Sequence, residues 1–378
     1  MANTLGVYNP IFYANEALIH LEKALGMASR VHLGYDEERR AFGKGETVNI
    51  RKPAVLTTNN APATAEDLAT ETVPVTLSYW REVKFALTDK ELAFTGERII
   101  NDHIRPAAYS LANDIDTKLA ALYKDTPWFY DLSGTPVVAD ITGPRKVMFD
   151  NNVPMEDLHY MINGTEEAGF LGLSAFAQQQ GAGDFGVDTQ RRGHLGTKYG
   201  FEMFSNQNVQ THTKGTADAT ALAVVAAVDA GVTTISLDAG SLTGTVVPGD
   251  SFVIAGNTQR YAITNTVTAA TNALTGVTFT PALAADAAED AVVTLRVDTH
   301  SANLAFHRNA FALVTAPLSE MGRELGAKIA TVMDPITGLS LRSRVYYIGN
   351  SSVVHVALDV LYGVKTLDPN LACRACGA

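Results

Sequence analysis

Two cysteines near the end of the chain form the first pattern that could carry chemistry. Cys373 and Cys376 are spaced as C-x-x-C and are the only cysteines among the 378 residues. A structural zinc ion needs four ligands, and a redox dithiol normally opens a helix in a βαβ unit, a context that this sequence lacks. We expect the pair to be incidental, and the alternatives are a shared metal and a crosslink between subunits. Disulfides are therefore not expected to hold the fold together.

The nine histidines show no spacing that is typical of a metal site. His300 and His307 lie seven residues apart without an acidic residue at the required offset, and no H-E-x-x-H sequence occurs. His212, His300 and His355 lie in strand-like surroundings, where we favour a hydrogen-bonded structural role over metal ligation. The sequence also lacks a calcium-binding D-x-D-x-D-G loop, a G-x-S-x-G elbow and a Walker A loop. It predicts no catalytic residue, no cofactor-binding residue and no metal ligand.

One glycine-rich segment matches the spacing of a dinucleotide-binding loop. Gly181, Gly183 and Gly186 fit G-x-G-x-x-G, but such a site needs a strand before it, a helix after it and an acidic residue about 20 positions further on. A run of glutamines precedes the glycines here, and the segment that follows has no apolar periodicity. We interpret it as a flexible loop.

Composition and charge exclude several classes of protein. Charged residues make up 18% of the chain and the formal net charge is −11, which argues against an electrostatic grip on nucleic acid or on an anionic membrane. The first residues do not form a signal peptide, and no stretch of 18 apolar residues offers a membrane span. We expect a soluble, acidic, intracellularly made protein of two or three domains.

A long helix between Thr95 and Pro127 is predicted to organise the chain. Apolar residues recur there at steps of three and four, at Ile100, Ile104, Ala108, Leu111, Ile115, Leu119 and Leu122. Polar residues take the other faces, at Asp102, Arg105, Asn113, Asp116 and Lys124. Because proline disrupts a helix interior, we expect a short helix to about Arg105 and then a long one that begins at Pro106 and extends about 28 Å.

The segments before this helix predict an arm and an extended loop. A short amphipathic helix begins at Asn15 and ends near Gly26, and we favour a surface helix covering the core over an arm that reaches a neighbour. Alternating strands containing Val48 and Val75 flank a polar segment, residues 56–72. Since a lone hairpin is barely stable, such an extended β-arm indicates assembly.

The composition changes between residues 213 and 298. This segment holds three basic and eight acidic residues, a net charge of −5, and is rich in Thr, Val and Ala. Short alternating runs at residues 233–237, 251–254, 261–264, 277–280 and 292–295 predict a small inserted sandwich or barrel. The flanking regions are mixed: helices are expected from Pro154 and in FLGLSAFAQQQ, strands near residues 303–314 and 341–362, and a loop-like tail from Lys365 onward.

Taken in order, these elements resemble the major capsid protein of tailed double-stranded DNA phages, which has the Hong Kong 97 fold. The stretch GDSFVIAGNTQRYAI is similar to the start of the inserted domain in coat proteins of the Salmonella short-tailed phage family. NLAFHRNAFALVTAPL, MDPITGLSLRSRVYY and ALDVLYGVKTLDPNLA resemble the closing segments of that family's core, and VPMEDLHYMIN resembles its core-domain helix entry.

The resemblance implies an α+β fold with an inserted all-β domain. The implied parts are an N-terminal arm at residues 1–43, an extended β-loop at 44–90, a peripheral domain with the spine helix at 91–130, the axial domain at 131–212 and 299–378, and the inserted β-barrel or sandwich at 213–298. Some relatives crosslink their subunits through a Lys–Asn isopeptide bond. Lys52 and Asn59 lie in or near the loop of this chain, but we do not favour such a crosslink here.

The function implied is a virion structural protein rather than an enzyme. The chain would assemble with itself into pentamers and hexamers of an icosahedral shell that encloses the genome, after synthesis in the host bacterial cytoplasm. Because no room is left for a scaffolding segment at its N-terminus, a separate scaffolding protein is expected, together with a portal protein and a possible decoration protein. No sequence-specific nucleic-acid binding and no membrane association are expected. A secreted or surface β-rich adhesin is the alternative, and an enzyme of unknown type a third reading.

Overall fold

The computed structural model describes residues 10–33, 47–51, 61, 72–88, 98–177, 189–193, 195–219, 221–318, 320, 327–333 and 339–377. The chain divides into two compact units. Unit 1 contains residues 1–116 and 312–365, and unit 2 contains residues 117–311 and 366–378. Each unit therefore combines segments that are far apart in the sequence, and each is described by itself.

The predicted long helix is present as α4, Arg98–Ala120. Ile104, Ala108, Leu111, Ile115 and Leu119 of the predicted stripe are all buried, which confirms the apolar face. The expected interruption at Pro106 is wrong, because α4 continues through it. Proline removes one backbone hydrogen bond, and burial of the flanking apolar side chains offsets that loss. The helix gives way to the 3-10 turn η3, Ala121–Asp125, before the predicted end at Lys124. The predicted start of the helix near Thr95 lies outside the described residues.

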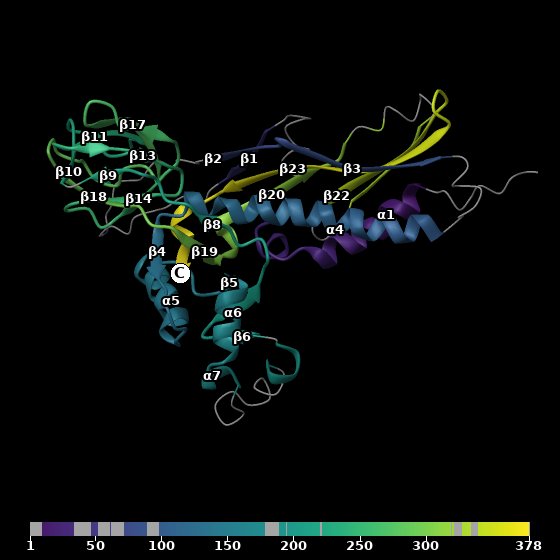
Figure 1. Cartoon of the computed structure of the whole chain (residues 1–378), viewed down its shortest axis with the longest axis horizontal. Helices are drawn as coiled ribbons and strands as arrows, with labels where there is room; N and C mark the ends of the chain where they lie inside the picture. Colours follow the sequence, from purple (N-terminus) through teal and green to yellow (C-terminus); the bar gives the residue numbers. More distant parts are fainter. Residues whose placement is uncertain are drawn as a thin grey trace, which may run out of the picture. The chain divides into compact units, whose positions relative to one another are not determined.

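Unit 1 places its helices beside a five-stranded sheet (Figure 1). The sheet contains β20 (Phe311–Ala316), β23 (Val353–Thr366), β22 (Ser340–Ile348) and β21 (Lys328–Met333) in that order, with β3 (Tyr79–Thr88) also paired with β23. Helix α1 (Pro10–Ala24) packs on β21 and β22, and the 3-10 turn η2 (Ala28–Arg30) follows it.

A separate two-stranded antiparallel sheet joins β1 (Thr47–Arg51) to β2 (Thr72–Thr76). Val48 and Ile50 are buried while their neighbours are exposed, as the alternating sequence predicts. The expected tip of the arm lies outside the described residues, apart from Ala61. The second predicted strand is interrupted after Thr76, where the backbone passes over Gly363: a Cβ atom on that glycine would lie 2.3 Å from the carbonyl oxygen of Thr76.

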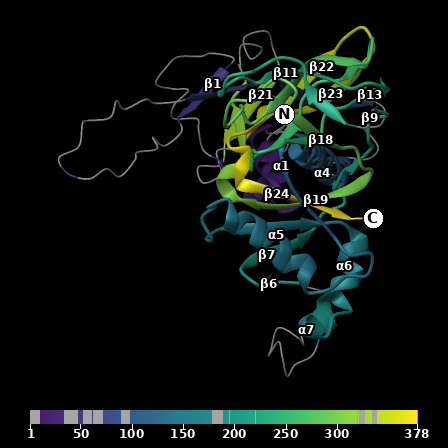
Figure 2. The ribbon, with the colours of Figure 1, turned by 90° about the vertical axis from the view of Figure 1, so that its left-hand side faces the viewer.

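Unit 2 contains a seven-stranded sheet with helices on one side. Its strands are β4 (Trp128–Asp131), β24 (Ala372–Gly377), β19 (His300–His307), β5 (Leu158–Ile162), β7 (Phe201–Ser205) and β6 (Thr197–Lys198), and β8 (Thr211–His212) also pairs with β19. Figure 2 shows α5 (Ala139–Asp150), α6 (Gly164–Leu171) and α7 (Ser174–Ala177) gathered on one side of β19 and β24.

Three sequence predictions for unit 2 need correction. The tail after Lys365 is not all loop, because Ala372–Gly377 forms β24 between β4 and β19 with all six residues buried. No helix begins at Pro154, since a bend there leads directly into β5. Helix α5 was not predicted because it contains Gly143 and Pro144. That glycine allows the helix to lie on Tyr130, whose ring would be 2.2 Å from an added Cβ atom.

The segment that follows β8 forms a closed barrel, as the short alternating runs predict. Its strands are β10 (Leu222–Val224), β11 (Thr234–Asp238), β17 (Ala273–Thr280), β15 (Arg260–Ile263), β14 (Ser251–Ile254) and β18 (Val292–Arg296). Two short ladders flank it, β9 (Asp218–Ala219) with β12 (Leu242–Thr243) and β13 (Thr245–Val246) with β16 (Val267–Thr268). The rings of Phe252, Tyr261 and Phe279 pack together in its core at centroid distances of 5.2–5.3 Å.

The fold contains no membrane-crossing helix among the described residues, since none of their helices combines sufficient length with sufficient hydropathy.

Candidate functional site

The two cysteines lie on β24 and are both buried and free. Because side chains alternate along a strand, residues three apart point to opposite faces of the sheet. Cys373 packs in the apolar cluster beneath α5 and α6, whereas Cys376 accepts a hydrogen bond from Nη1 of Arg296 in the barrel at 3.5 Å. The two thiols therefore cannot form one metal site or a disulfide with each other. Burial raises the pKa of both thiols.

The second face of the sheet carries the buried guanidinium of Arg374. Phe129, Asp131, Arg374 and Cys376 are register partners on β4 and β24 and share that face. Their contacts are with residues of the barrel, and we call this contact region the joint. The joint connects two bodies that each have an apolar core of their own.

An aromatic ring between two guanidinium groups forms one edge of the joint. The Cζ atom of Arg296 lies 3.7 Å from the ring centroid of Phe129, and that of Arg260 lies 4.1 Å from it. Arg260 also donates from Nη1 to the carbonyl oxygen of Phe129 at 3.0 Å, and Arg296 pairs with Asp131. Burial is the main cause that lowers the pKa of Arg260. A desolvated cation over an aromatic face is a favourable contact, so both arginines hold the barrel against β4.

A chain of hydrogen bonds forms the centre of the joint. The hydroxyl of Tyr123 lies 3.1 Å from Nδ1 of His212, and Nε2 of the same histidine lies 3.1 Å from Oδ1 of Asp250. Asp250 also accepts from the backbone N–H of Val247 at 2.9 Å. The turn next to it requires a glycine: Gly249 has φ +105°, and an added Cβ atom would lie 2.9 Å from the His212 ring.

His300 lies beside His212 where the chain leaves and re-enters the sheet. The two residues are register partners in the β8–β19 pair, and their rings are 5.1 Å apart. Nδ1 of His300 is 2.9 Å from the carbonyl oxygen of Asp298, while Nε2 is buried without a hydrogen-bond partner. Burial, followed by the charge of Arg374, lowers the pKa of His300 to about 4.

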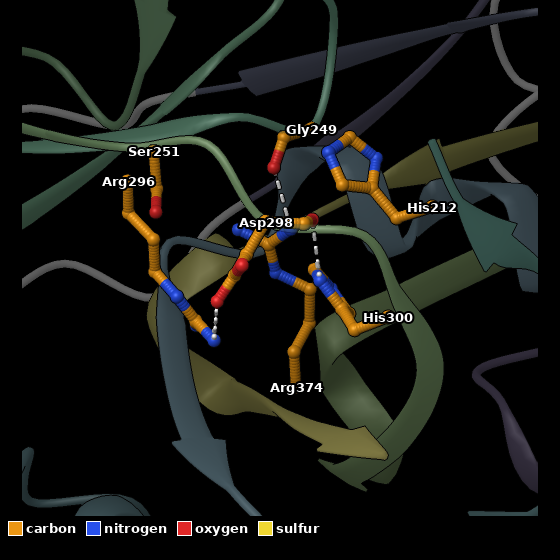
Figure 3. A pocket seen from close by; sticks show the side chains of 7 residues that line it. All are labelled: His212, Gly249, Ser251, Arg296, Asp298, His300 and Arg374. Atoms are coloured by element: carbon orange, nitrogen blue, oxygen red, sulfur yellow. Dashed lines mark hydrogen bonds and ion pairs between the residues drawn. The ribbon is translucent and has the colours of Figure 1, made fainter. Parts of the chain in front are cut away.

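The guanidinium of Arg374 extends from β24 of the sheet and contacts the turn before β14 of the barrel. It is 1% exposed and donates from Nη1 to the carbonyl oxygen of Gly249 at 2.6 Å. Burial lowers its pKa. Figure 3 shows it at the centre of a small pocket whose lining residues are His212, Gly249, Ser251, Arg296, Asp298, His300 and Arg374.

The joint is suited to holding structure rather than to turnover. A Tyr–His–Asp sequence of donors and acceptors can relay a proton in an enzyme, but Tyr123, His212 and Asp250 are at most 3% exposed. The pocket beside them has no space for even a water molecule. Buried polar groups that are satisfied in this way fix one geometry, so the arrangement orients the barrel on the sheet.

The remaining residues that the sequence singled out do not join this cluster. Nδ1 of His307 accepts a hydrogen bond from the backbone N–H of Asn309, and His355 stacks on Tyr346 with ring centroids 5.3 Å apart. Across the described residues, no group of three or more His, Cys, Asp or Glu side chains could hold a metal ion. The glycine-rich segment at Gly181 and the pair Lys52 and Asn59 lie outside those residues.

Comparison with known proteins gives results at the level of structure alone. No protein-family model and no curated protein matches the chain. The chain is similar to a structure from Mycobacterium phage Che8, at 14% identity and a TM-score of 0.48, with 93% of this chain and 90% of that chain covered. It is also similar to the capsid structure of the cyanophage P-SCSP1u, at 12% identity and a TM-score of 0.45, covering 89% and 84%. The mature capsid of bacteriophage PhiM1 gives 11% identity and a TM-score of 0.44, covering 89% and 83%.

Proposed function

We propose that the chain is a major capsid protein of the Hong Kong 97 type. It would self-assemble into pentamers and hexamers of an icosahedral shell around the double-stranded DNA of a tailed phage. The observation that carries this proposal is the order of elements along the chain. The β1–β2 pair precedes the long helix α4, and the barrel is inserted between β8 and β19 of an α/β sheet. This is the order that the resemblance of the sequence to that family led us to expect.

The β1–β2 pair supports assembly with further copies. Among the described strands these two pair only with each other. Val48, Ile50 and Val75 are buried within the chain, whereas the side chains on the other face of the ladder, such as Asn49 and Arg51, are exposed, so a neighbouring copy can cover that second face. We therefore assign residues 44–90 to contact with an adjacent subunit.

Exposed aromatic side chains support the same reading. Trp80 on β3 is 59% exposed, Tyr109 on α4 is 57% exposed and Phe149 on α5 is 67% exposed. Aromatic residues are enriched in the cores of protein–protein interfaces, and closed assemblies of identical chains bury the same patches in every copy. Each of these side chains is thus a candidate for a contact between copies.

The proposed capsid function also assigns a role to each remaining part of the chain. Residues 91–130 would form the peripheral domain, residues 131–212 and 299–378 the axial domain, and residues 213–298 the insertion. Partners would be a separate scaffolding protein, a portal protein and a decoration protein, and the chain would be made in the host cytoplasm and end in the virion. A net charge of −11 suits an inner wall that does not bind the packaged DNA tightly.

Light scattering on purified chain tests the proposal. We expect the wild-type protein to form rings or larger closed particles as its concentration rises. Phe149→Glu should weaken this assembly at least about tenfold, because it places a charge in a buried contact. Ala139→Glu adds the same charge at another exposed position of α5 and serves as the matched control. A wild-type chain that stays monomeric at every concentration even when the scaffolding protein is added would contradict the proposal, and equal assembly of both variants would remove Phe149 from the interface.

A further inference from the structure

The chain enters and leaves the barrel through two strands that pair with each other. These are β8 and the start of β19, and the register places His212 directly opposite His300 at this neck. We propose that the His212–His300 pair is an acid-sensitive latch. When His300 takes up a proton, the joint opens and releases the barrel from the seven-stranded sheet, while the barrel and the sheet each stay folded. This inference stands independently of the proposed capsid function.

The geometry of the closed joint fits neutral histidine rings. If Nδ1–H of His300 donates to the carbonyl oxygen of Asp298 at 2.9 Å, Nε2 is left as a bare acceptor, and it is buried. His212 is satisfied when the hydroxyl of Tyr123 donates to Nδ1 and Nε2–H donates to Asp250. In this form each ring has one N–H group, and each N–H group has an acceptor.

Apart from the hydrogen bond to the carbonyl oxygen of Asp298, the surroundings of His300 disfavour a second proton on its ring. Its Nε2 would carry a buried N–H without an acceptor, which costs free energy in addition to the cost of the buried charge. Arg374 is a cation that lines the same pocket, and it is itself fully buried. The titratable and charged groups around His300 are His212 on β8, Arg374 on β24, Arg296 at the end of β18 and Asp298, which follows that strand. Tyr123 on η3 and Asp250 in the turn before β14 contact His212, and Cys376 on β24 contacts Arg296.

The two acidic groups in that set do not offset the new charge. Asp250 already accepts from His212, from Val247 and from the backbone N–H of Gly215. The side chain of Asp298 lies 3.6 Å from Arg296 and is 64% exposed, so solvent screens it. A proton on His300 therefore produces a net repulsion inside the joint.

The pKa of His300 gives the direction of the pH dependence. The closed joint lowers this pKa from 6.5 to about 4, so the open state binds the proton more tightly. The latch is fully closed above the ordinary pKa, and its stability is lost as the pH falls from 6.5 toward 4. A difference of this size corresponds to a rise of about 300-fold in the opening constant between a pH well above 6.5 and a pH well below 4, and about 80-fold of that rise falls between pH 6.5 and pH 4.

The barrel and the sheet can survive the release because their apolar cores are separate. The barrel buries its own cluster, which includes Phe252 and Tyr261, and the sheet buries another beneath α5 and α6, which includes Tyr160 and Phe201. Opening the joint exposes the ring of Phe129 together with polar and cationic groups, and it leaves both clusters intact.

Fluorescence of Trp128 provides the experiment. The indole N–H of Trp128 donates to Asn370, and the ring lies beneath Arg260 of the barrel at 5.7 Å, so its emission reports on the joint. The chain has two tryptophans, and Trp80→Phe in the full-length protein makes Trp128 the only reporter. From pH 7 to pH 4 we expect its emission to change and the amides of β8 and of His300 to exchange faster, with the far-ultraviolet circular dichroism unchanged.

His300→Asn in the same background should abolish this transition, and His355→Asn, which removes a histidine stacked on Tyr346 in unit 1, should leave it in place. An unaltered transition in the His300→Asn chain overturns the latch, as does loss of the circular dichroism signal together with the fluorescence change. If His300→Asn does not fold, the histidine Cε1–H resonances of the wild-type chain decide the matter. His300 must titrate near pH 4 together with opening, and either event without the other overturns the proposal.

Discussion

The carboxylate of Asp116 accepts a hydrogen bond from the backbone N–H of Gly26 at 2.7 Å. The same side chain accepts from the backbone N–H groups of Met27 at 3.3 Å and Ala28 at 2.9 Å. One helix residue thus satisfies three consecutive amides of the segment that follows α1. Asp116 is 3% exposed, so its side chain is buried even though it lies outside the apolar stripe predicted for the helix.

Replacing Asp116 should therefore loosen the N-terminal segment. Asp116→Ala leaves three amides without their acceptor, and we expect a loss of about 3 kcal/mol in the stability of unit 1. Ser110→Ala, at an exposed position of the same helix, is the control and should change little. Hydrogen exchange of residues 26–28 measures the effect, and unchanged protection in Asp116→Ala would show that the carboxylate does not hold this segment.

Gly363 allows two strands of unit 1 to cross closely. Gly363→Ala places a methyl group 2.3 Å from the carbonyl oxygen of Thr76, so backbone must move and stability should fall by about 2 kcal/mol. Gly349→Ala is the matched control, since an added Cβ atom at Gly349 meets nothing within 4 Å. Thermal unfolding compares the two, and equal melting temperatures would argue against the close crossing.

The ring of Phe129 should matter for the joint through its two arginine contacts. Phe129→Leu keeps an apolar side chain but removes the π face beneath Arg260 and Arg296, and we expect a loss of about 1–2 kcal/mol. Phe149→Leu makes the same change at an exposed site and is expected to be neutral for the isolated chain. Limited proteolysis at the barrel boundaries reports the difference. Identical cleavage of both variants would show that the ring contributes nothing to holding the barrel.

Glu166 should give a second pH dependence of opposite sign to that of His300. Burial, with a further contribution from Asp140, raises the pKa of Glu166 above 4.5, so the folded state binds its proton more tightly than the unfolded state. Its stabilising effect is present below the ordinary pKa and is lost as the pH rises through the raised one. Glu166→Gln should thus gain stability relative to wild type at pH 7 but not at pH 4. Glu167→Gln is the control on the same turn, and a gain that is equal at both pH values would contradict this account.

Periodic patterns in the sequence predicted those helices and strands that bury one face and expose the other. The stripe from Ile104 to Leu119 gave α4, and the alternation around Val48 gave β1, because a single face of each packs on the core. Elements that depend on a distant partner carried no such pattern. The strand β24 is built from small residues and is defined by β4 and β19 on either side, and α5 tolerates Gly143 because Tyr130 fills the space.

The joint could not be predicted either, because it also depends on residues that are far apart in the sequence. His212 and His300 are 88 positions apart in sequence and meet only through the register of β8 on β19. Arg374 is a charged side chain in a short polar-looking segment, and nothing local signals that it is fully buried. The sequence could indicate only that an insertion begins and ends near these histidines.

The central claim is that this chain builds a closed shell, and negative-stain electron microscopy tests it most directly. The wild-type chain would be expressed alone and together with a candidate scaffolding protein, and each sample would be imaged at the same protein concentration. We predict five- and six-membered rings or closed icosahedral particles of uniform diameter in the co-expressed sample. A chain that remains monomeric in the presence of the scaffolding protein, while still folded by circular dichroism, would contradict the capsid function.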